Sequence, residues 1–238
     1  METSVLIETD FEQLYLAIRE YEGRVYTDAD VACLPTVDAS HKYYNEWQVR
    51  KRSADRLVNH LQKKNKPLNI LEVGCGNGWL AAKLADIPGA KVTGLDINRA
   101  EISQARRVFK KDNLQFVNDR IDGDMIRDMH FDVIVFAAVL PYFTSVQSIL
   151  QTALDKLYPR GEIHITDTNF YHPGEVDGAI QRCADYYTEM GFPQMAELYY
   201  HHTLNVLKDF NYQVLFDPGN ILNRLGKKEP FYWIRIKK

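Results

Sequence analysis

The middle of the chain alternates short apolar runs with segments whose apolar residues recur at helical spacing. Five short runs predict strands, at 68–73, 91–95, 114–117, 131–136 and 162–166. Helical spacing predicts helices at 78–85, 99–110 and 146–157. Strands that alternate with helices predict βαβ units and a parallel sheet. The unbroken apolar run inside 131–136 suits a strand that is covered on both faces.

Different patterns flank this central part. Helical spacing at 11–22 and 43–62 predicts that residues 1–66 form a helical extension, which we expect to act as a lid. Residues 67–238 form the predicted core, with a helical insertion at about 170–210. The insertion shows two helical patterns, 177–190 and 194–210.

Two more apolar runs, 212–216 and 231–236, predict the last strands. The connection between them is rich in turn residues, with Pro218, Gly219 and Gly226. Because it lacks a full helical crossover, we expect these two strands to pair antiparallel. The sheet would then have seven strands, most of them parallel.

Composition limits the classes of protein that this chain can represent. Its 238 residues suffice for one α/β domain with an appended segment. A net charge of −3 does not favour a dedicated nucleic-acid binder. Cys33, Cys75 and Cys183 are too widely spaced for a metal knuckle or a redox pair, so we expect reduced thiols in a cytoplasmic protein. The N-terminus shows no signal-peptide pattern, and the longest apolar stretch, 133–140, is too short to cross a membrane.

A glycine-rich loop follows the first predicted core strand. Gly74, Gly76 and Gly78 permit positive φ angles and let a ligand approach bare backbone N–H groups at a helix start. A dinucleotide-binding loop needs its third glycine one position later, where this chain has Trp79. Glu72, two residues before the first glycine, would repel a pyrophosphate but could accept a hydrogen bond from a cationic amino group.

At these residues the sequence resembles the class I S-adenosylmethionine-dependent methyltransferase family. The resemblance covers roughly residues 68–166 and rests on five segments: 72–78, 92–96, 116–119, 131–140 and 157–163. It implies a Rossmann-like, doubly wound α/β fold. It also implies S-adenosylmethionine as cofactor and S-adenosylhomocysteine as product.

The resemblance assigns cofactor roles residue by residue. Asp96 would bind both ribose hydroxyls, and Asp119 would lie near the adenine amino group, although Asn118 stands where the family often has glycine. Asp122 and Asp124 are alternatives to Asp119. The predicted cofactor-binding residues are Glu72, Gly74, Cys75, Gly76, Gly78, Asp96, Ile97, Asp119, Arg120 and Ala137.

The acceptor side carries weaker signals, and we assign no catalytic residue. Methyl transfer from a sulfonium chiefly requires alignment, so a general base is needed only for acceptors that must lose a proton early. The candidate acceptor residues lie beside expected strand ends or in the extension: Tyr43, Trp47, Tyr142, Asp167 and Tyr171. For each one the alternative is simple packing or, at Asp167, a turn cap.

Histidines and tyrosines complete the inventory of candidate groups. His164 lies inside a predicted strand and is expected to be a hydrogen-bonded core residue. His172, His201 and His202 lack ligand spacing with any cysteine or acid, so we predict no metal site. Four tyrosines of the insertion suit an apolar small-molecule pocket or a dimer surface, which leaves the oligomeric state open: Tyr186, Tyr187, Tyr199 and Tyr200.

The predicted function is therefore methyl transfer from S-adenosylmethionine to a small-molecule acceptor. The alternative is a non-catalytic S-adenosylmethionine-binding module or partner subunit. A nicotinamide oxidoreductase is disfavoured by Trp79. Nucleic acid is not an expected partner, because residues 137–140 lack an Asn-Pro-Pro-Tyr-type motif and the basic clusters at 50–52, 63–66 and 110–111 suit solvated helix faces.

Overall fold

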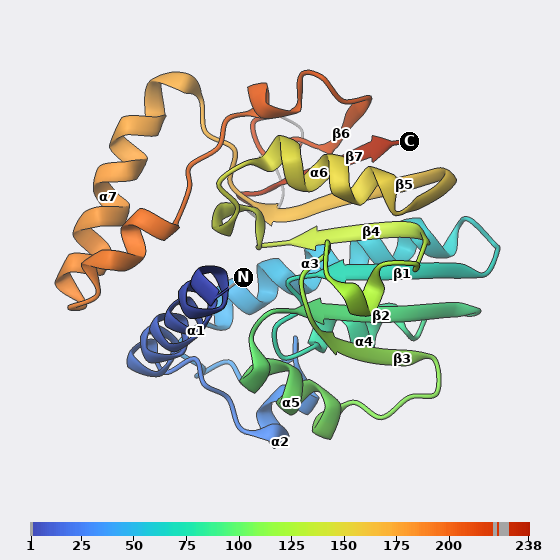
Figure 1. Cartoon of the computed structure of the whole chain (residues 1–238), viewed down its shortest axis with the longest axis horizontal. Coiled ribbons are helices and arrows are strands. Elements are labelled where there is room, and N and C mark those ends of the chain that lie inside the picture. Colours follow the sequence, from blue (N-terminus) through green and yellow to red (C-terminus); the bar gives the residue numbers. More distant parts are fainter. Residues whose placement is uncertain (1, 221–222, 224–228) are drawn as a thin grey trace.

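The computed structural model describes residues 2–220, 223 and 229–238, with side chains described from residue 11 onward. A seven-stranded sheet forms its centre, in the order β3-β2-β1-β4-β5-β7-β6 (Figure 1). Only β7 runs against the other strands. The strands are β1 Leu68–Val73, β2 Ala90–Asp96, β3 Leu114–Asn118, β4 Phe131–Ala137, β5 Leu157–Thr168, β6 Tyr212–Phe216 and β7 Tyr232–Lys237.

Helices cover both faces of this sheet and one of its edges. The α-helices are α1 Glu2–Glu22, α2 Asp28–Cys33, α3 Tyr44–Gln62, α4 Trp79–Leu84, α5 Arg99–Val108, α6 Val146–Asp155 and α7 Val176–Glu189. Short 3₁₀ segments are η1 Asp124–Ile126, η2 Leu140–Tyr142, η3 Pro173–Glu175, η4 Pro193–Leu198 and η5 Leu204–Leu207. Among the helices of the described residues, none has the length and apolar character needed to span a membrane.

Alternate residues of the central strands build two separate cores. Val133 and Val135 of β4 pack with α3, α4 and α5 on one face. Ile134 and Phe136 of the same strand pack with α6 on the other face. All four side chains are fully buried, which explains the continuous apolar run in this strand.

The register brings the carboxyl ends of the parallel strands to one edge. Val73 pairs with Leu95 of β2 and with Phe136 of β4, and Ala137 pairs with Thr166 of β5. The helices α1 and α7 both lie at this edge, where the arrowheads of β4 and β5 point (Figure 1). Ligands of open α/β sheets bind at such an edge.

The predicted fold class is confirmed, including the antiparallel pairing of β6 and β7. One predicted helix, 194–210, is wrong: two 3₁₀ segments stand there, separated by extended backbone. The backbone N–H of Tyr200 donates to the Pro141 carbonyl, and the His202 carbonyl accepts from Tyr171, so tertiary hydrogen bonds replace helical ones. The short helix α2 was not predicted, and Gly226 lies outside the described residues.

Candidate cofactor and acceptor site

The glycine loop joins β1 to α4 at the carboxyl edge of the sheet. Gly74, Gly76 and Gly78 have φ angles of 71°, 51° and 81°, a region that glycine occupies without strain. The backbone N–H groups of Gly74 and Cys75 both donate to the Leu95 carbonyl, at 2.8 and 3.0 Å. These bonds hold the loop over the end of β2.

Gly78 and Cys75 belong to the predicted cofactor-binding residues, and both contribute to the packing around the loop. A Cβ atom on Gly78 would lie 2.5 Å from the ring of Phe116, so this glycine allows α4 to approach the sheet. The Cys75 thiol is buried and lies against Gly94, and burial raises its pKa well above the usual value. Cys75 therefore offers a ligand its backbone rather than its sulfur.

Asp96 ends β2 directly beside the loop. One carboxylate oxygen accepts the Gly76 N–H at 2.8 Å, and the other accepts the Asn98 N–H at 2.8 Å. Burial raises the pKa of Asp96, and these two backbone bonds oppose that rise. Each oxygen keeps a further lone pair, so the carboxylate can also accept from a pair of hydroxyl groups.

Glu72 lies beneath the loop and is only 3% exposed. Its Oε2 atom is buried without a hydrogen-bond partner among the described residues. Burial and the charge of Asp96 raise its pKa well above 4.5, whereas the Ala81 N–H acts in the opposite direction. An unpartnered buried carboxylate oxygen fits a ligand that brings a hydrogen-bond donor.

Glu101 is a site residue that the sequence analysis missed. In the first turn of α5, its Oε2 lies 3.6 Å from the position of a Cβ on Gly76. Burial and the charge of Asp96 raise its pKa to about 7, and Arg19 opposes this rise. The one signal available in the sequence was an acid in the helix that follows Asp96.

The ends of β3 and β4 supply the remaining predicted cofactor residues. Both carboxylate oxygens of Asp119 accept backbone N–H groups, from Arg120 and Met125, each at 2.8 Å. The exposed guanidinium of Arg120 binds Asp122 at 3.0 Å. Ala137 is half-buried at the end of β4 and precedes Ala138, which has a φ of 58°.

The turn after β2 is held by the Asn118 side chain and exposes Ile97. The Asn118 side-chain amide donates to the carbonyls of Asp96 and Ile97, at 3.0 and 2.8 Å. Asn118 thus ties the end of β3 to the end of β2, a role that glycine could not supply. Ile97 is 37% exposed beside Asp96, which leaves an apolar side chain available to a ligand ring.

Helix α1 covers this edge of the sheet. Glu12 accepts the backbone N–H groups of Arg99 and Ala100 at 2.7 and 3.3 Å, which fastens α1 to the start of α5. Burial raises the pKa of Tyr15; the charge of Arg19 opposes this rise, whereas the charges of Glu101 and Asp96 add to it.

Aromatic rings connect α1 to the acceptor candidates. Tyr142 contacts Phe11 and Tyr15 of α1, with centroid distances of 5.7 and 6.0 Å. It also contacts Tyr199 at 5.6 Å. Tyr199 in turn lies 5.4 Å from His201, whose ring lies 5.4 Å from Tyr171. Tyr142 and Tyr171 are therefore parts of one aromatic wall, defined by Phe11, Tyr15, Tyr142, Tyr171, Tyr199 and His201.

Asp167 lies at the carboxyl end of β5. It has a φ of 52° and is 8% exposed, and its Oδ1 atom is buried without a partner. Burial raises its pKa to about 6, against the charge of Arg50 and a hydrogen bond from Ser53. The structure thus brings Asp167 toward two residues of α3.

Tyr43 and Trp47 do not lie with this group. The Trp47 indole is buried, donates to the Tyr26 hydroxyl at 3.1 Å and meets Trp79 edge-on at 5.6 Å. The Tyr43 hydroxyl donates to the Glu22 carbonyl at 2.6 Å. Both side chains hold the N-terminal helices together and against the core.

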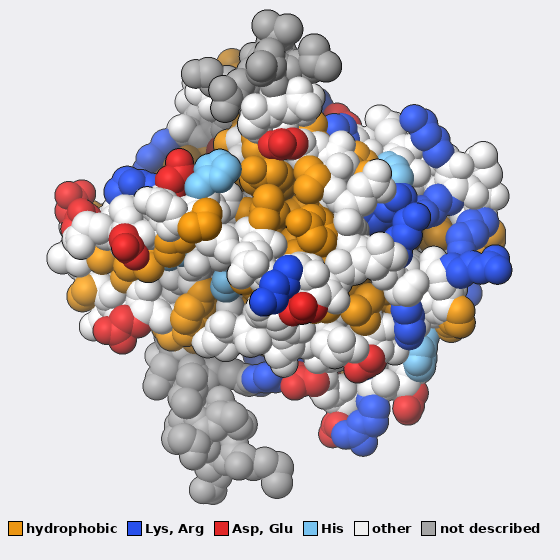
Figure 2. Space-filling model, turned by 90° about the horizontal axis from the view of Figure 1, so that it is seen from above, with side chains coloured by type: hydrophobic (Ala, Val, Ile, Leu, Met, Phe, Trp, Pro, Cys, Tyr) orange, Lys and Arg blue, Asp and Glu red, His pale blue; other side chains and the backbone are white. Residues whose placement is uncertain are grey.

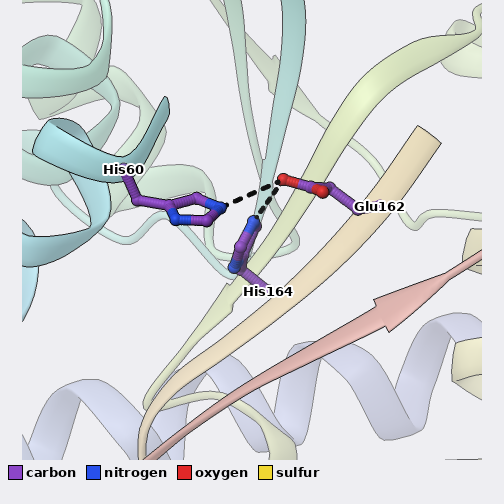
Figure 3. Close-up of side chains that lie close together, drawn as sticks. All are labelled: His60, Glu162 and His164. Atoms are coloured by element: carbon purple, nitrogen blue, oxygen red, sulfur yellow. Dashed lines mark hydrogen bonds and ion pairs between the residues drawn. The ribbon is translucent and has the colours of Figure 1, made fainter. Parts of the chain in front are cut away.

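A second cluster of polar groups lies between the middle of β5 and the last turn of α3. His60, Glu162 and His164 offer potential ligand atoms within 4.8 Å of one another (Figure 3). The Trp233 indole N–H donates to Nδ1 of His164 at 3.0 Å, and Nε2 of His164 lies 2.8 Å from Glu162. In neutral His164 the proton must then reside on Nε2, which leaves that atom without a lone pair for a metal.

Glu162 is also bound by an ammonium group. Lys64 lies 2.8 Å from its Oε1 atom, which is the atom that His164 contacts. His164 is fully buried and hydrogen-bonded at both ring nitrogens, as expected for a core histidine. The cluster is a hydrogen-bond and ion-pair network that joins α3 to the sheet.

Several cations of the basic clusters pair with acids of the same chain. Lys66 binds Asp132 at 3.0 Å, and Lys111 binds Asp86 at 2.5 Å. Arg50 binds Glu46 at 3.0 Å. The face seen in Figure 2 carries acidic and basic side chains around a central hydrophobic area.

A family model described as "Methyltransferase domain" matches residues 64–234. The chain belongs to this methyltransferase domain family. The match includes β1 to β6, the first half of β7 and the loop described above, and it confirms the resemblance found in the sequence.

Several curated methyltransferases are similar to part of this family member. A malonyl-(acyl-carrier protein) O-methyltransferase of Bacillus cytotoxicus is 32% identical over 124 residues, covering 50% of this chain and 42% of that protein. A ubiquinone biosynthesis O-methyltransferase of Nitrosococcus oceani is 31% identical over 116 residues, covering 48% of each chain. The chain thus spans less than half the length of these relatives.

Solved methyltransferase structures share the fold. The plantazolicin methyltransferase in complex with SAH has a TM-score of 0.59 and 19% identity, covering 95% of this chain and 99% of that one. A magnesium protoporphyrin IX methyltransferase from Synechocystis, with bound SAM, has a TM-score of 0.59 and 15% identity, covering 94% and 96%. At such identities the likeness concerns the fold alone.

Proposed function

We propose that this methyltransferase-family chain transfers a methyl group from S-adenosylmethionine to a small-molecule acceptor. The observation that carries the proposal is the unpartnered buried oxygen of Glu72 beside the glycine loop, with Asp96 at the next strand end. A cofactor with an ammonium group and a ribose diol supplies donors for these two carboxylates.

The residues present fit this cofactor. Glu72 would bind its ammonium group, Asp96 its ribose hydroxyls and the exposed Ile97 one face of its adenine. Asp119 and Arg120 would offer the adenine its polar contacts, and Ala137 would lie against the methionine part. When bound, the cofactor supplies an activated methyl group on a sulfonium, so the protein chiefly aligns the acceptor and excludes water.

Residues 1–66 supply the covering of the site in this proposal. Glu12 fixes α1 to the start of α5, and Tyr15 of α1 contributes its ring to the aromatic wall through its contact with Tyr142. Ile18 of α1 packs in a separate small cluster with Tyr187 and Met195, outside the two cores of the sheet, so α1 can move without unfolding those cores. We therefore propose α1 as the lid of the site.

The acceptor is proposed to bind between the aromatic wall and Asp167. Tyr142 and Tyr171 belong to that wall, whereas Trp47 and Tyr43 act through packing of the helices. A nucleic-acid acceptor is not supported, because Arg50, Lys66 and Lys111 are paired with acids of the chain. Three free thiols are in keeping with a cytoplasmic location.

Calorimetry tests the cofactor part of the proposal. We expect S-adenosylmethionine and S-adenosylhomocysteine to bind and NAD to bind much more weakly, since Trp79 occupies the third dinucleotide-glycine position. Preferential binding of NAD would refute it. A chain that binds S-adenosylmethionine yet transfers no radiolabelled methyl group to any acceptor would instead be a non-catalytic binding module.

A further inference from the structure

We propose that Asp167 receives the proton of the acceptor's nucleophilic group, and that the acceptor is an aromatic compound with a hydroxyl or amine nucleophile. This inference rests on the proposed function and names the substrate class of the same site.

The backbone places Asp167 beside the end of β4. Thr166 pairs with Ala137, and the Thr166 carbonyl accepts the Ala138 N–H at 3.0 Å. The pairing of β5 with β7 shifts between Ile165 and Thr168, and Asp167 itself has a φ of 52°. A non-glycine residue held in this region costs stability, and such residues concentrate at functional sites.

The carboxylate of Asp167 faces α3, where its charge is not matched by a direct ion pair. Arg50 and Ser53 are its neighbours on that helix, and Arg56 and Glu229 act on it from further away. Among the described residues, Asp167 makes no ion pair. The two arginines whose charges act on it bind other acids: Arg50 binds Glu46, and Arg56 binds Glu229. Oδ1 therefore remains buried and unpartnered.

Asp167 and the aromatic wall belong to the same two strand ends. Tyr142 lies four residues after Ala138, whose N–H donates to the Thr166 carbonyl at 3.0 Å, and Tyr171 lies four residues after Asp167. Tyr142 and Tyr171 are joined through the rings of Tyr199 and His201. Flat aromatic compounds stack or meet edge-on with such rings, as the wall residues already do with one another.

The unpartnered oxygen of Asp167 favours an acceptor whose nucleophilic group carries a proton. A hydroxyl or amine can donate to Oδ1, whereas a carboxylate acceptor has no proton to give and would be repelled by Asp167. During transfer the acceptor's oxygen or nitrogen provides the electron pair for its new bond to the methyl carbon. The pair of the broken carbon–sulfur bond stays on sulfur, and the acceptor's proton passes to Oδ1, which leaves a neutral carboxyl group.

Three probe compounds with one ring and different nucleophiles test the proposal: catechol, benzylamine and benzoate. Each is incubated with the full chain and tritiated S-adenosylmethionine, and its binding to the S-adenosylhomocysteine complex is measured by calorimetry. We expect transfer to catechol or benzylamine, the two arms that separate hydroxyl from amine chemistry, and none to benzoate.

The Asp167→Asn variant supplies the second readout. We expect kcat to fall about 100-fold, the lower end of the effect of a general base, with S-adenosylhomocysteine affinity unchanged within about twofold. In the wild type, kcat should rise with pH through about 6 as Asp167 ionises, and the variant should lack this rise. Asp185→Asn, an exposed acid on α7, is the matched control and should keep both the rate and the pH profile.

Three results would overturn the proposal and leave the proposed function standing. They are methylation of benzoate in preference to the other probes, an Asp167→Asn variant with the wild-type rate and pH profile, and a wild-type chain that binds S-adenosylhomocysteine but neither binds nor methylates catechol or benzylamine. A wild-type chain that does not bind S-adenosylmethionine would instead refute the proposed function, and the inference with it.

Discussion

Gly74 and Val139 are in such close contact that a Cβ atom on Gly74 would lie 2.2 Å from Cγ2 of Val139. The glycine belongs to the loop after β1, and the valine follows the end of β4. Their contact joins the proposed cofactor loop to the segment after Ala137, the residue proposed to lie against the methionine part of the cofactor. A side chain at Gly74 would therefore push these two segments apart.

We expect Gly74→Ala to destabilise the chain by about 2–4 kcal/mol, through a strained φ and overpacking against Val139. Gly23→Ala is a matched control, because Gly23 has the same φ of 71° with nothing within 4 Å of an added Cβ. It should cost only about 1–2 kcal/mol. Chemical denaturation measures both variants. Val139→Ala should remove only part of the difference, because the Cβ atom of residue 139 would still lie 2.7 Å from the added Cβ. Equal losses in the two glycine variants would contradict the clash.

Asp96→Ala should weaken S-adenosylhomocysteine binding by about 1–3 kcal/mol, because ligand hydroxyls lose their acceptor. Calorimetry measures the change. Asp86→Ala serves as control, since Asp86 binds Lys111 at the opposite edge of the sheet and should keep the wild-type affinity. An Asp96 variant with unaltered affinity would argue against its role in holding the ribose.

Glu12→Ala should loosen α1, because Arg99 and Ala100 lose their shared acceptor. The loss of one such helix-capping carboxylate is worth about 1 kcal/mol, or roughly fivefold in a binding constant. We expect faster dissociation of S-adenosylhomocysteine in stopped flow and faster hydrogen exchange in α1. The neighbouring exposed Gln13→Ala should change neither. If Glu12→Ala also changed neither, α1 would not act as the lid.

Acid should destabilise the chain through Glu162. Hydrogen bonds and charges from His164 and Lys64 outweigh burial and lower the pKa of Glu162 from 4.5 to about 2. Because the folded chain binds this proton less readily than the unfolded chain, the stabilisation is complete above about pH 4.5 and is lost as the pH falls toward 2.

Urea denaturation from pH 7 to pH 2 measures this effect. Glu162→Gln should lower stability at pH 7 and flatten the acid limb, whereas the exposed Glu189→Gln should follow the wild type. Parallel acid limbs in the wild type and Glu162→Gln would show that other carboxyl groups carry the acid sensitivity.

The central fold could be predicted because its signals are local. The apolar runs at 68–73 and 131–136 are buried on both faces over most of their length, so their composition alone marks them as strands. The edge run 114–117 is buried only at Phe116 and Val117. The segment 194–210 misled the prediction, because its helical spacing competes with hydrogen bonds to Pro141 and Tyr171 that no local pattern encodes. Helix α2 was missed although Thr27 and Asp30 form a capping box, since it has only six residues.

Some features of the candidate site also follow from local sequence, and others depend on the tertiary structure. The sequence by itself determined the glycine loop, Glu72 and Asp96, because they lie within one βαβ unit whose geometry follows from its own residues. Only the tertiary structure decided that Trp47 packs on Trp79, that Glu101 faces the loop and that Asp167 is buried with one oxygen unpartnered. These facts depend on burial and on contacts between α1, α3, β5 and the insertion. Segments so far apart in the chain meet only when the whole core is packed, and no local pattern records that meeting.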